Sequence, residues 1–275
     1  TFYRNWYLGD WATPVGIDQT NPLSVDLVDN CYIAVCYQTM SKIASLLNKT
    51  DDSRGYKAKY DALTKRIQET FYDAKGNTYA SGTQIDLVYP MLAGVTPDNL
   101  KETVLKTLYE VTANRFQGHL ATGLVGIPVL TEWVVKNGQA EWMYQMLKKR
   151  DYPGYLYMLD NGATTTWEHW NGERSHIHNC YNGIGAWFYQ ALAGIMPDES
   201  KPGYKHIWIK PQVVNDISWV QASKDTPYGL LKVRWEKKEV SFVLDVQIPV
   251  GASASVSLPF SAESVCVNGQ PSQGK

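Results

Sequence analysis

The chain has 275 residues, of which 44% are hydrophobic, and its 26 Lys and Arg residues nearly balance its 27 Asp and Glu residues. This composition can build a substantial core and excludes a chain that is mainly disordered. The net charge of −1 argues against a nucleic-acid partner. No run of about 18 apolar residues is present, so no membrane span is expected.

Helical periodicity dominates the first two-thirds of the sequence. Apolar residues recur on one face of six successive segments, and the pattern predicts helices over residues 23–48, 53–72, 83–93, 96–111, 123–135 and 139–148. Thr96 is expected to cap the fourth of these helices, with Pro97 at its first position. A seventh helix is expected over residues 179–193. The connections are short, so neighbouring helices should form antiparallel hairpins.

Two parts of the sequence lack this periodicity. Residues 150–178 are instead rich in Tyr, Trp, Thr, Gly and His, and a loop of this length inside a compact domain is usually functional. After Pro197, apolar runs separated by Pro and Gly turns predict short strands over residues 206–209, 217–220, 230–235, 240–244 and 255–258. The sequence therefore predicts a mainly α domain, residues 1–197, followed by a small antiparallel β-sandwich, residues 198–275.

The aromatic composition favours Trp and Tyr over Phe, with ten Trp and eighteen Tyr residues against six Phe residues. Trp and Tyr offer a flat face for stacking together with a polar group, a combination that suits sugar binding. A large helical core would use the same residues. The four cysteines, Cys31, Cys36, Cys180 and Cys266, lack the spacing of a metal site and predict reduced, buried thiols.

The strongest candidate for chemistry is the segment Gly162-Ala-Thr-Thr-Thr-Trp-Glu-His-Trp170. Glu168 lies between Trp167 and Trp170, and aromatic surfaces can exclude water, position a sugar ring and adjust the pKa of the carboxyl group. Glu168 is therefore a candidate general base that draws a proton from an attacking water molecule. The same spacing is compatible with core tryptophans beside a solvated loop acid.

Weaker candidates lie elsewhere in the sequence. His178 precedes the last expected helix and is a candidate hydrogen-bond donor to a sugar hydroxyl or to Glu168. Asp10 and Trp11 offer a hydroxyl acceptor beside a stacking face, and all three residues are equally compatible with structural roles. His176 and His178 do not form a chelating pair, and motifs for nucleotide binding, serine hydrolysis and metalloprotease chemistry are absent. No metal and no cofactor is expected.

Several motifs in a fixed order carry a resemblance to a known family. They are Tyr7-Leu-Gly-Asp-Trp11, Leu120-Ala-Thr-Gly-Leu-Val-Gly126, Tyr152-Pro-Gly-Tyr-Leu-Tyr-Met158, the segment 162–170, and Gly194-Ile-Met-Pro-Asp198 followed by Pro202-Gly-Tyr-Lys205. With them the chain resembles bacterial α-L-rhamnosidases of glycoside hydrolase family seventy-eight over essentially its whole length. The resemblance implies an (α/α)6 toroid of six helix hairpins followed by a β-sandwich. It also implies inverting hydrolysis of terminal α-L-rhamnose from glycosides or polysaccharides.

The resemblance further implies roles for individual residues. It assigns Glu168 as the general base, and it assigns substrate contacts to Asp10, Trp11, Trp167, Trp170 and His178. In this family the general acid lies in an Asp- and Arg-rich segment N-terminal to the Gly-Asp-Trp motif, and this chain begins after that segment. The expected helices are also fewer than the six hairpins of a toroid need.

The chain is therefore expected to be the C-terminal portion of a catalytic region and to be inactive on its own. Exposed apolar helix faces favour self-association or pairing with the missing N-terminal portion. Two alternatives remain from the sequence: another (α/α)6 inverting glycosidase of the α-L-fucosidase or glucoamylase type, and a non-catalytic carbohydrate-binding fragment.

Overall fold

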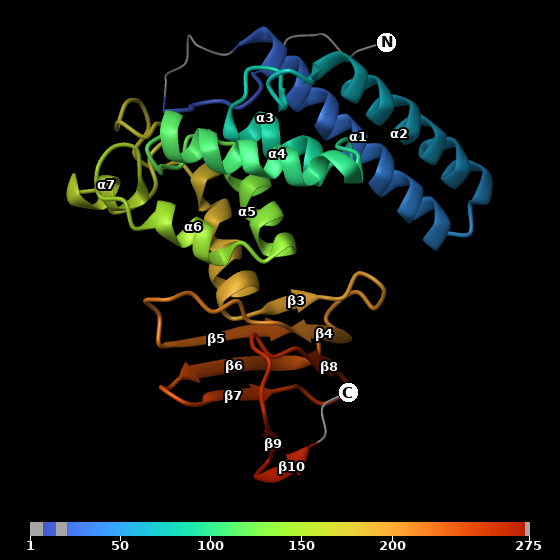
Figure 1. Ribbon diagram of the computed structural model, residues 1–275. Coiled ribbons are helices and arrows are strands. Elements are labelled where there is room, and N and C mark those ends of the chain that lie inside the picture. Colours follow the sequence, from blue (N-terminus) through green and yellow to red (C-terminus); the bar gives the residue numbers. More distant parts are fainter. Residues whose placement is uncertain (1–7, 15–20, 273–275) are drawn as a thin grey trace. The chain divides into compact units, whose positions relative to one another are not determined.

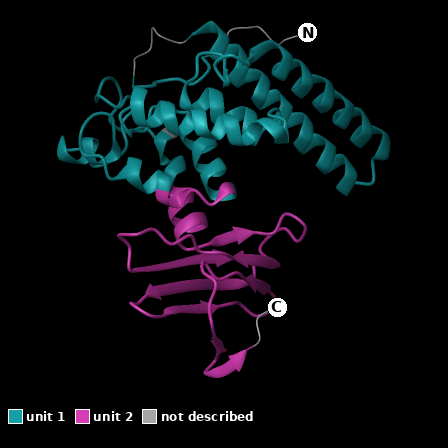
Figure 2. Ribbon diagram, viewed as in Figure 1, with its two compact units in different colours: residues 1–136, 142–184 teal, residues 137–141, 185–275 magenta. Residues whose placement is uncertain are grey.

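The computed structural model describes residues 8–14 and 21–272; Tyr7 of the first motif lies outside them. The chain forms two compact units (Figure 2): residues 1–136 with 142–184, and residues 137–141 with 185–275. We expected the division at residue 197, whereas the units separate at residue 184. Residues 185–197 belong with the β unit because the strand at Ile195–Pro197 pairs with the strand at His206–Ile209.

The first unit is built from helices that lie close to the predicted ranges (Figure 1). Up to residue 184 the helices are α1 (Pro22–Leu46), α2 (Thr50–Phe71), α3 (Gln84–Leu92), α4 (Asp98–Glu110), the π-helical segment η2 (Val111–Arg115), α5 (Gly126–Asn137), α6 (Ala140–Leu147), α7 (Tyr155–Asp160) and the 3-10 turn η3 (Cys180–Ile184). A two-stranded hairpin, β1 (Tyr72–Asp73) with β2 (Thr78–Tyr79), follows α2. Among the described residues, none of the helices is long and apolar enough to span a membrane.

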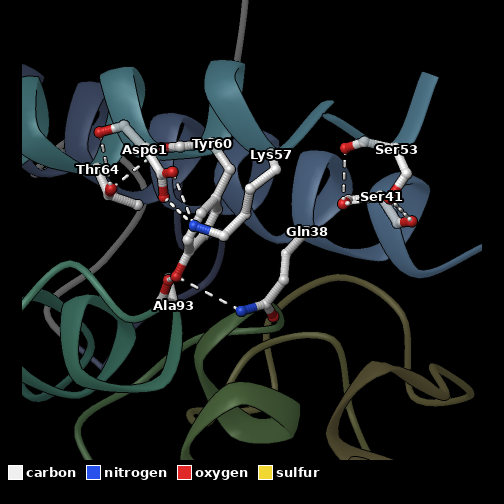
Figure 3. Close-up of polar contacts among 8 residues, drawn as sticks. All are labelled: Gln38, Ser41, Ser53, Lys57, Tyr60, Asp61, Thr64 and Ala93. Carbon is white, nitrogen blue, oxygen red and sulfur yellow. Dashed lines mark hydrogen bonds and ion pairs between the residues drawn. The ribbon is translucent and has the colours of Figure 1, made fainter. Parts of the chain in front are cut away.

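Helices α1 and α2 form a long hairpin and lie side by side (Figure 1). Reciprocal bonds join them, because the Ser41 hydroxyl donates to the Ser53 carbonyl at 2.9 Å and the Ser53 hydroxyl donates to the Ser41 carbonyl at 3.0 Å (Figure 3). The Tyr60 hydroxyl of α2 donates to the carbonyl of Ala93, directly after α3, at 2.9 Å. These contacts satisfy hydroxyl groups that the hairpin partly buries and fix it to the next helix.

Aromatic packing holds the later helices together. Trp142 of α6 packs edge-on against Tyr109 of α4, with ring centroids 5.5 Å apart, and against Trp133 of α5, with centroids 6.1 Å apart. Trp133 is 3% exposed. Part of the Trp and Tyr content therefore serves the helical core, as the composition allowed.

Two local predictions for the helices are wrong, and a third helix is present but irregular. Helix α4 begins at Asp98 with Pro97 as its cap, because the Thr96 hydroxyl accepts a hydrogen bond from Tyr79 instead of capping the helix. The stretch 150–178 contains the six-residue helix α7, which is too short to show a period. The seventh expected helix is present over residues 180–192 but is irregular: the 3-10 turn η3 continues through Gly185 and Ala186 into the π-helical η4 (Trp187–Leu192).

The second unit contains two three-stranded sheets and a small C-terminal hairpin. Its strands are β3 (Ile195–Pro197), β4 (His206–Ile209), β5 (Trp219–Thr226), β6 (Gly229–Lys237), β7 (Phe242–Gln247), β8 (Ser253–Val256), β9 (Val265–Val267) and β10 (Gln270–Ser272). The order β5-β6-β7 is antiparallel throughout, as expected. In the order β3-β4-β8, however, β4 and β8 run parallel, with His206 opposite Ser253.

The two sheets of this unit share one hydrophobic core. Ile195, Ile207 and Ile209 come from β3 and β4, and Leu231 and Val233 come from β6; each of them is at most 2% exposed. Along β6, buried side chains alternate with side chains that are exposed or half-buried. This arrangement is typical of a sheet that covers a core with one face.

Candidate active site

The loop after α7 folds back on itself, so that residues about ten positions apart in the sequence lie side by side. The Glu168 amide donates to the Ser175 carbonyl at 2.8 Å, and the His178 amide donates to the Thr166 carbonyl at 2.9 Å. The chain reverses at Gly172, whose φ of 83° is easily adopted only by glycine. Residues 166–178 therefore form a hairpin-like loop that places His178 beside Glu168.

The Glu168 carboxylate is surrounded by nitrogen groups. Its side chain is 14% exposed. Oε2 accepts the Ser175 amide at 3.4 Å and lies 3.8 Å from Nδ1 of His178. Oε1 lies 3.8 Å from both Nε2 of His169 and Nη1 of Arg174. Each of these neighbours is a donor or a potential cation, so the arrangement favours a charged carboxylate.

The balance of these effects lowers the pKa of Glu168. Loss of water around the carboxyl group raises its pKa, but the Ser175 amide, a hydrogen bond from the Trp11 side chain, and the imidazoles of His178 and His169 together outweigh desolvation. The pKa of Glu168 therefore lies below its ordinary value, and the group is ionised at neutral pH. An ionised carboxylate can accept a proton from water, which suits a general base better than a general acid.

Trp11, which is far from this loop in the sequence, also contacts the residues around Glu168. The guanidinium of Arg174 lies over the Trp11 ring at 5.4 Å from its centroid, and the His169 ring meets Trp11 edge-on at 6.1 Å. The neighbouring Ala12 carbonyl accepts a hydrogen bond from the buried Tyr181 hydroxyl. Trp11, Glu168 and His178, which the sequence singled out separately, therefore meet in one cluster.

Asp10 has a different environment from its neighbour Trp11. It is 6% exposed, and its carboxylate accepts the amides of Gly123 at 2.7 Å, Val125 at 3.1 Å and Gly126 at 2.7 Å. Because α5 begins at Gly126, Asp10 acts as a remote cap for the start of that helix. Asp10 thus ties the segment that carries Trp11 to α5, and its expected substrate contact stays a prediction.

Trp167 and Trp170 are both buried. Trp167 is 6% exposed and stacks on His176 at 4.9 Å between ring centroids. Trp170 is 1% exposed, its indole donates to the Thr122 carbonyl at 2.9 Å, and its ring packs on Tyr181 at 4.3 Å. Both side chains support the loop that carries Glu168, and their expected role as pocket walls stays a prediction.

Sequence reasoning missed His169 and Arg174 as neighbours of the carboxylate. Their only signal was closeness to Glu168 in the chain, and the fold of the loop decides which side chains turn toward it. His119, in contrast, anchors the loop near α7, because Nδ1 lies 2.8 Å from the Pro153 carbonyl and Nε2 lies 3.2 Å from Asp151 Oδ2.

The cysteines and other possible ligands offer no metal centre. Among the described residues, no group of three or more His, Cys, Asp or Glu side chains could hold a metal ion. Cys31 is a buried free thiol, as expected, and Cys36 is half-buried. Cys266 is exposed on the short strand β9, so the prediction of a buried thiol is wrong there.

Comparisons with known proteins agree with this architecture. The sequence model of the bacterial alpha-L-rhamnosidase six-hairpin glycosidase domain matches residues 2–192, and that of the bacterial alpha-L-rhamnosidase C-terminal domain matches residues 194–272. A curated alpha-L-rhamnosidase from Formosa agariphila is 28% identical over 267 residues, which covers 91% of this chain and 28% of that protein.

Solved structures show the same relationship. The structure of alpha-L-rhamnosidase from Dictyoglumus thermophilum aligns with a TM-score of 0.88 and 30% identity, covering 94% of this chain and 30% of that one. The Streptomyces avermitilis alpha-L-rhamnosidase, solved in complex with L-rhamnose, aligns with a TM-score of 0.83 and 24% identity over 93% of this chain and 25% of that one. The chain thus spans less than a third of each of these relatives. It belongs to the bacterial α-L-rhamnosidases, as part of a six-hairpin glycosidase domain joined to the C-terminal domain of the same family.

Proposed function

We propose that this chain carries the general-base part of an inverting α-L-rhamnosidase that removes terminal α-L-rhamnose from glycosides or polysaccharides. The observation that carries the proposal is the ionised Glu168 carboxylate, held among donors and potential cations beside Trp11. Family membership supports the choice of sugar, because the relatives are α-L-rhamnosidases.

In this proposal Glu168 takes a proton from a water molecule as that water attacks the anomeric carbon. The bond to the leaving oxygen breaks on the opposite face of the sugar, and a separate general acid protonates that oxygen. The resemblance places this acid outside the chain. His178, with a side chain 32% exposed beside Glu168, is positioned to bond a sugar hydroxyl, and Trp11 offers a stacking face.

The first test concerns the isolated chain. We expect no hydrolysis of an aryl α-L-rhamnoside by the 275-residue protein, because an inverting reaction needs both carboxyl groups. Measurable turnover by the purified chain would contradict this expectation. Titration of L-rhamnose against the same protein, followed by Trp fluorescence, separates a binding fragment from a chain that needs the remaining hairpins to bind sugar.

The second test places Glu168→Gln in a complete catalytic domain. This chain would replace the matching part of the Dictyoglumus thermophilum enzyme, once the unaltered chimera is shown to be active. We expect Glu168→Gln to lower kcat by at least about a hundredfold while rhamnose binding is retained. Glu173→Gln is the matched control, because Glu173 is an exposed carboxyl in the same loop. Normal turnover by Glu168→Gln would refute the assignment.

We further propose that the apolar face of α1 pairs with other hairpins of the same six-hairpin domain. Tyr32, Met40 and Ile43 of α1 and Leu47 directly after it, together the α1 stripe, follow helical spacing and are 59%, 40%, 43% and 63% exposed. Four exposed apolar side chains in a row are typical of an interface. The family is defined by six hairpins, and this chain spans less than a third of its relatives, which supports hairpins outside the chain as the covering partner.

A further inference from the structure

His169 has an unusual environment for a buried histidine. The residue is 4% exposed, and its Nε2 atom has no hydrogen-bond partner among the described residues. Buried polar atoms are nearly always hydrogen-bonded, because leaving one unsatisfied costs about 1–3 kcal/mol. A buried nitrogen without a partner therefore calls for a physical explanation beyond packing.

The Nε2 atom of His169 lies near the candidate base. It lies 3.8 Å from Oε1 of Glu168, which is too far for a hydrogen bond but close enough for an electrostatic effect on a carboxylate that is only 14% exposed. The edge-on contact with Trp11, at 6.1 Å between centroids, keeps the imidazole ring in this position.

The other charged groups around Glu168 come from the same loop. Arg174 shares Oε1 with His169, although its side chain is 53% exposed and its charge is correspondingly screened by water. His178 and the Ser175 amide face Oε2. His169 is thus the one fully buried group among the described neighbours that faces Oε1.

We propose that His169 is a positioning residue for the general base: its buried Nε2–H group is directed at Oε1 of Glu168, holds that carboxylate in place and keeps it ionised. The inference rests on the proposed function of Glu168. Its consequence for the reaction is that Glu168 stays a competent base at a lower pH than it would without His169.

A purely structural role for His169 makes a different prediction. If the ring only fills the space beside Trp11, a phenylalanine ring should replace it without changing the ionisation of Glu168. If Nε2 acts on Oε1, His169→Phe should make Glu168 easier to protonate even though a ring is still present. The two roles therefore differ in a property of Glu168 that can be measured without substrate.

The experiment follows the carboxyl carbon of Glu168 by NMR during a pH titration of the 275-residue chain labelled with carbon-13 at Glu carboxyl groups. The Glu168 signal is the one missing from the spectrum of Glu168→Gln. We expect His169→Phe to move the midpoint of this titration upward by about one pH unit, since an interaction that favours the ionised form is lost. His169→Gln, which retains an N–H donor, should restore part of the difference.

The matched control is His176→Phe. His176 is in the same loop and stacks on Trp167, but its Nε2 lies 2.7 Å from the Gly172 carbonyl and not beside Glu168. We expect the Glu168 midpoint to stay unchanged in this variant. An unchanged midpoint in folded His169→Phe would overturn the proposal, and if that variant does not fold, an unchanged midpoint in folded His169→Leu, which also lacks a donor, does so. Because no turnover is measured, these results are independent of whether Glu168 proves to be the base.

Discussion

At the scale of single residues, the pKa values of the two carboxyl groups that the sequence singled out, Glu168 and Asp10, are shifted in opposite directions. Glu168 keeps contact with solvent, and its nearby donors and imidazoles lower its pKa. Asp10 accepts three amides, yet burial raises the pKa of its carboxyl group to about 6 because desolvation outweighs these bonds. Access to water, more than the number of hydrogen bonds, therefore separates the group suited to proton transfer from the group that ties two segments together.

Asp10 should make the stability of the chain depend on pH. Its folded-state pKa of about 6 lies above the usual 3.8, so between these values the folded chain binds more protons than the unfolded chain. The free energy of unfolding should therefore fall as the pH rises from about 4 to about 6, by up to about 3 kcal/mol from this group. Burial also raises the pKa of Asp29 to about 6, which adds a change of the same sign.

Urea unfolding of the wild type and Asp10→Asn at several pH values in this range tests the prediction. The variant has no carboxyl group at this position, so its free energy of unfolding should fall less steeply as the pH rises. Equal slopes in the two proteins would show that Asp10 has the same pKa in the folded and unfolded states.

The residues around Glu168 also show what a sequence can and cannot predict about this site. The segment 162–170 identified Glu168, and His178 lies near it at 3.8 Å, which is beyond hydrogen-bond length, so its expected role as a donor stays a prediction. His169 and Arg174 could not be predicted, because the reversal at Gly172 decides which side chains face the carboxylate. A loop of this kind has no period from which the direction of a side chain can be read.

At the scale of elements, the junction between the Asp10 segment and α5 leaves no room for a side chain at Gly123. A Cβ atom on Gly123 would lie 2.0 Å from the Trp11 carbonyl oxygen and 2.9 Å from Asp10 Oδ1. The first of these is a backbone atom that cannot rotate away, so Gly123→Ala should destabilise the chain by about 3 kcal/mol or more. Chemical denaturation followed by circular dichroism measures the change.

Gly55 provides the matched control for this substitution. It lies within α2, is exposed, and a Cβ atom there would have no heavy atom within 4 Å. Gly55→Ala should therefore stabilise the chain by about 0.5–1 kcal/mol, because alanine loses less backbone entropy in a helix. If Gly123→Ala and Gly55→Ala changed the free energy of unfolding in the same direction, this explanation of the junction would be wrong.

The elements that could be predicted are those with a long repeat of apolar residues. Helices α1 and α2 extend over many turns, so the period identified them within a few residues of their ends. The short helix α7 and the parallel pairing of β4 with β8 have no comparable signal. Strand direction depends on which segments meet after folding, and alternation along a strand carries no information about it.

At the scale of the whole molecule, the chain spans less than a third of the relatives that it matches. Helix α1 contacts α2 and α3 on one side, while the α1 stripe of Tyr32, Met40, Ile43 and Leu47 is exposed. Exposed apolar side chains that share one face of a helix are typical of a surface that packs against a partner. In the isolated chain, a second copy can cover the same stripe in place of the hairpins that we propose as its partners.

The isolated chain should therefore associate with itself in a concentration-dependent way, and the double variant Met40→Lys/Ile43→Lys should prevent this. Both side chains are about two-fifths exposed, so lysine can reach water without disturbing the core, and like charges then face each other across any pair of α1 stripes. Sedimentation velocity over a range of concentrations measures the association.

Leu159→Lys is the matched control, because Leu159 is 60% exposed on α7 and lies outside the stripe. This variant should associate like the wild type. A wild-type chain that stays monomeric throughout would show that the α1 stripe does not drive association.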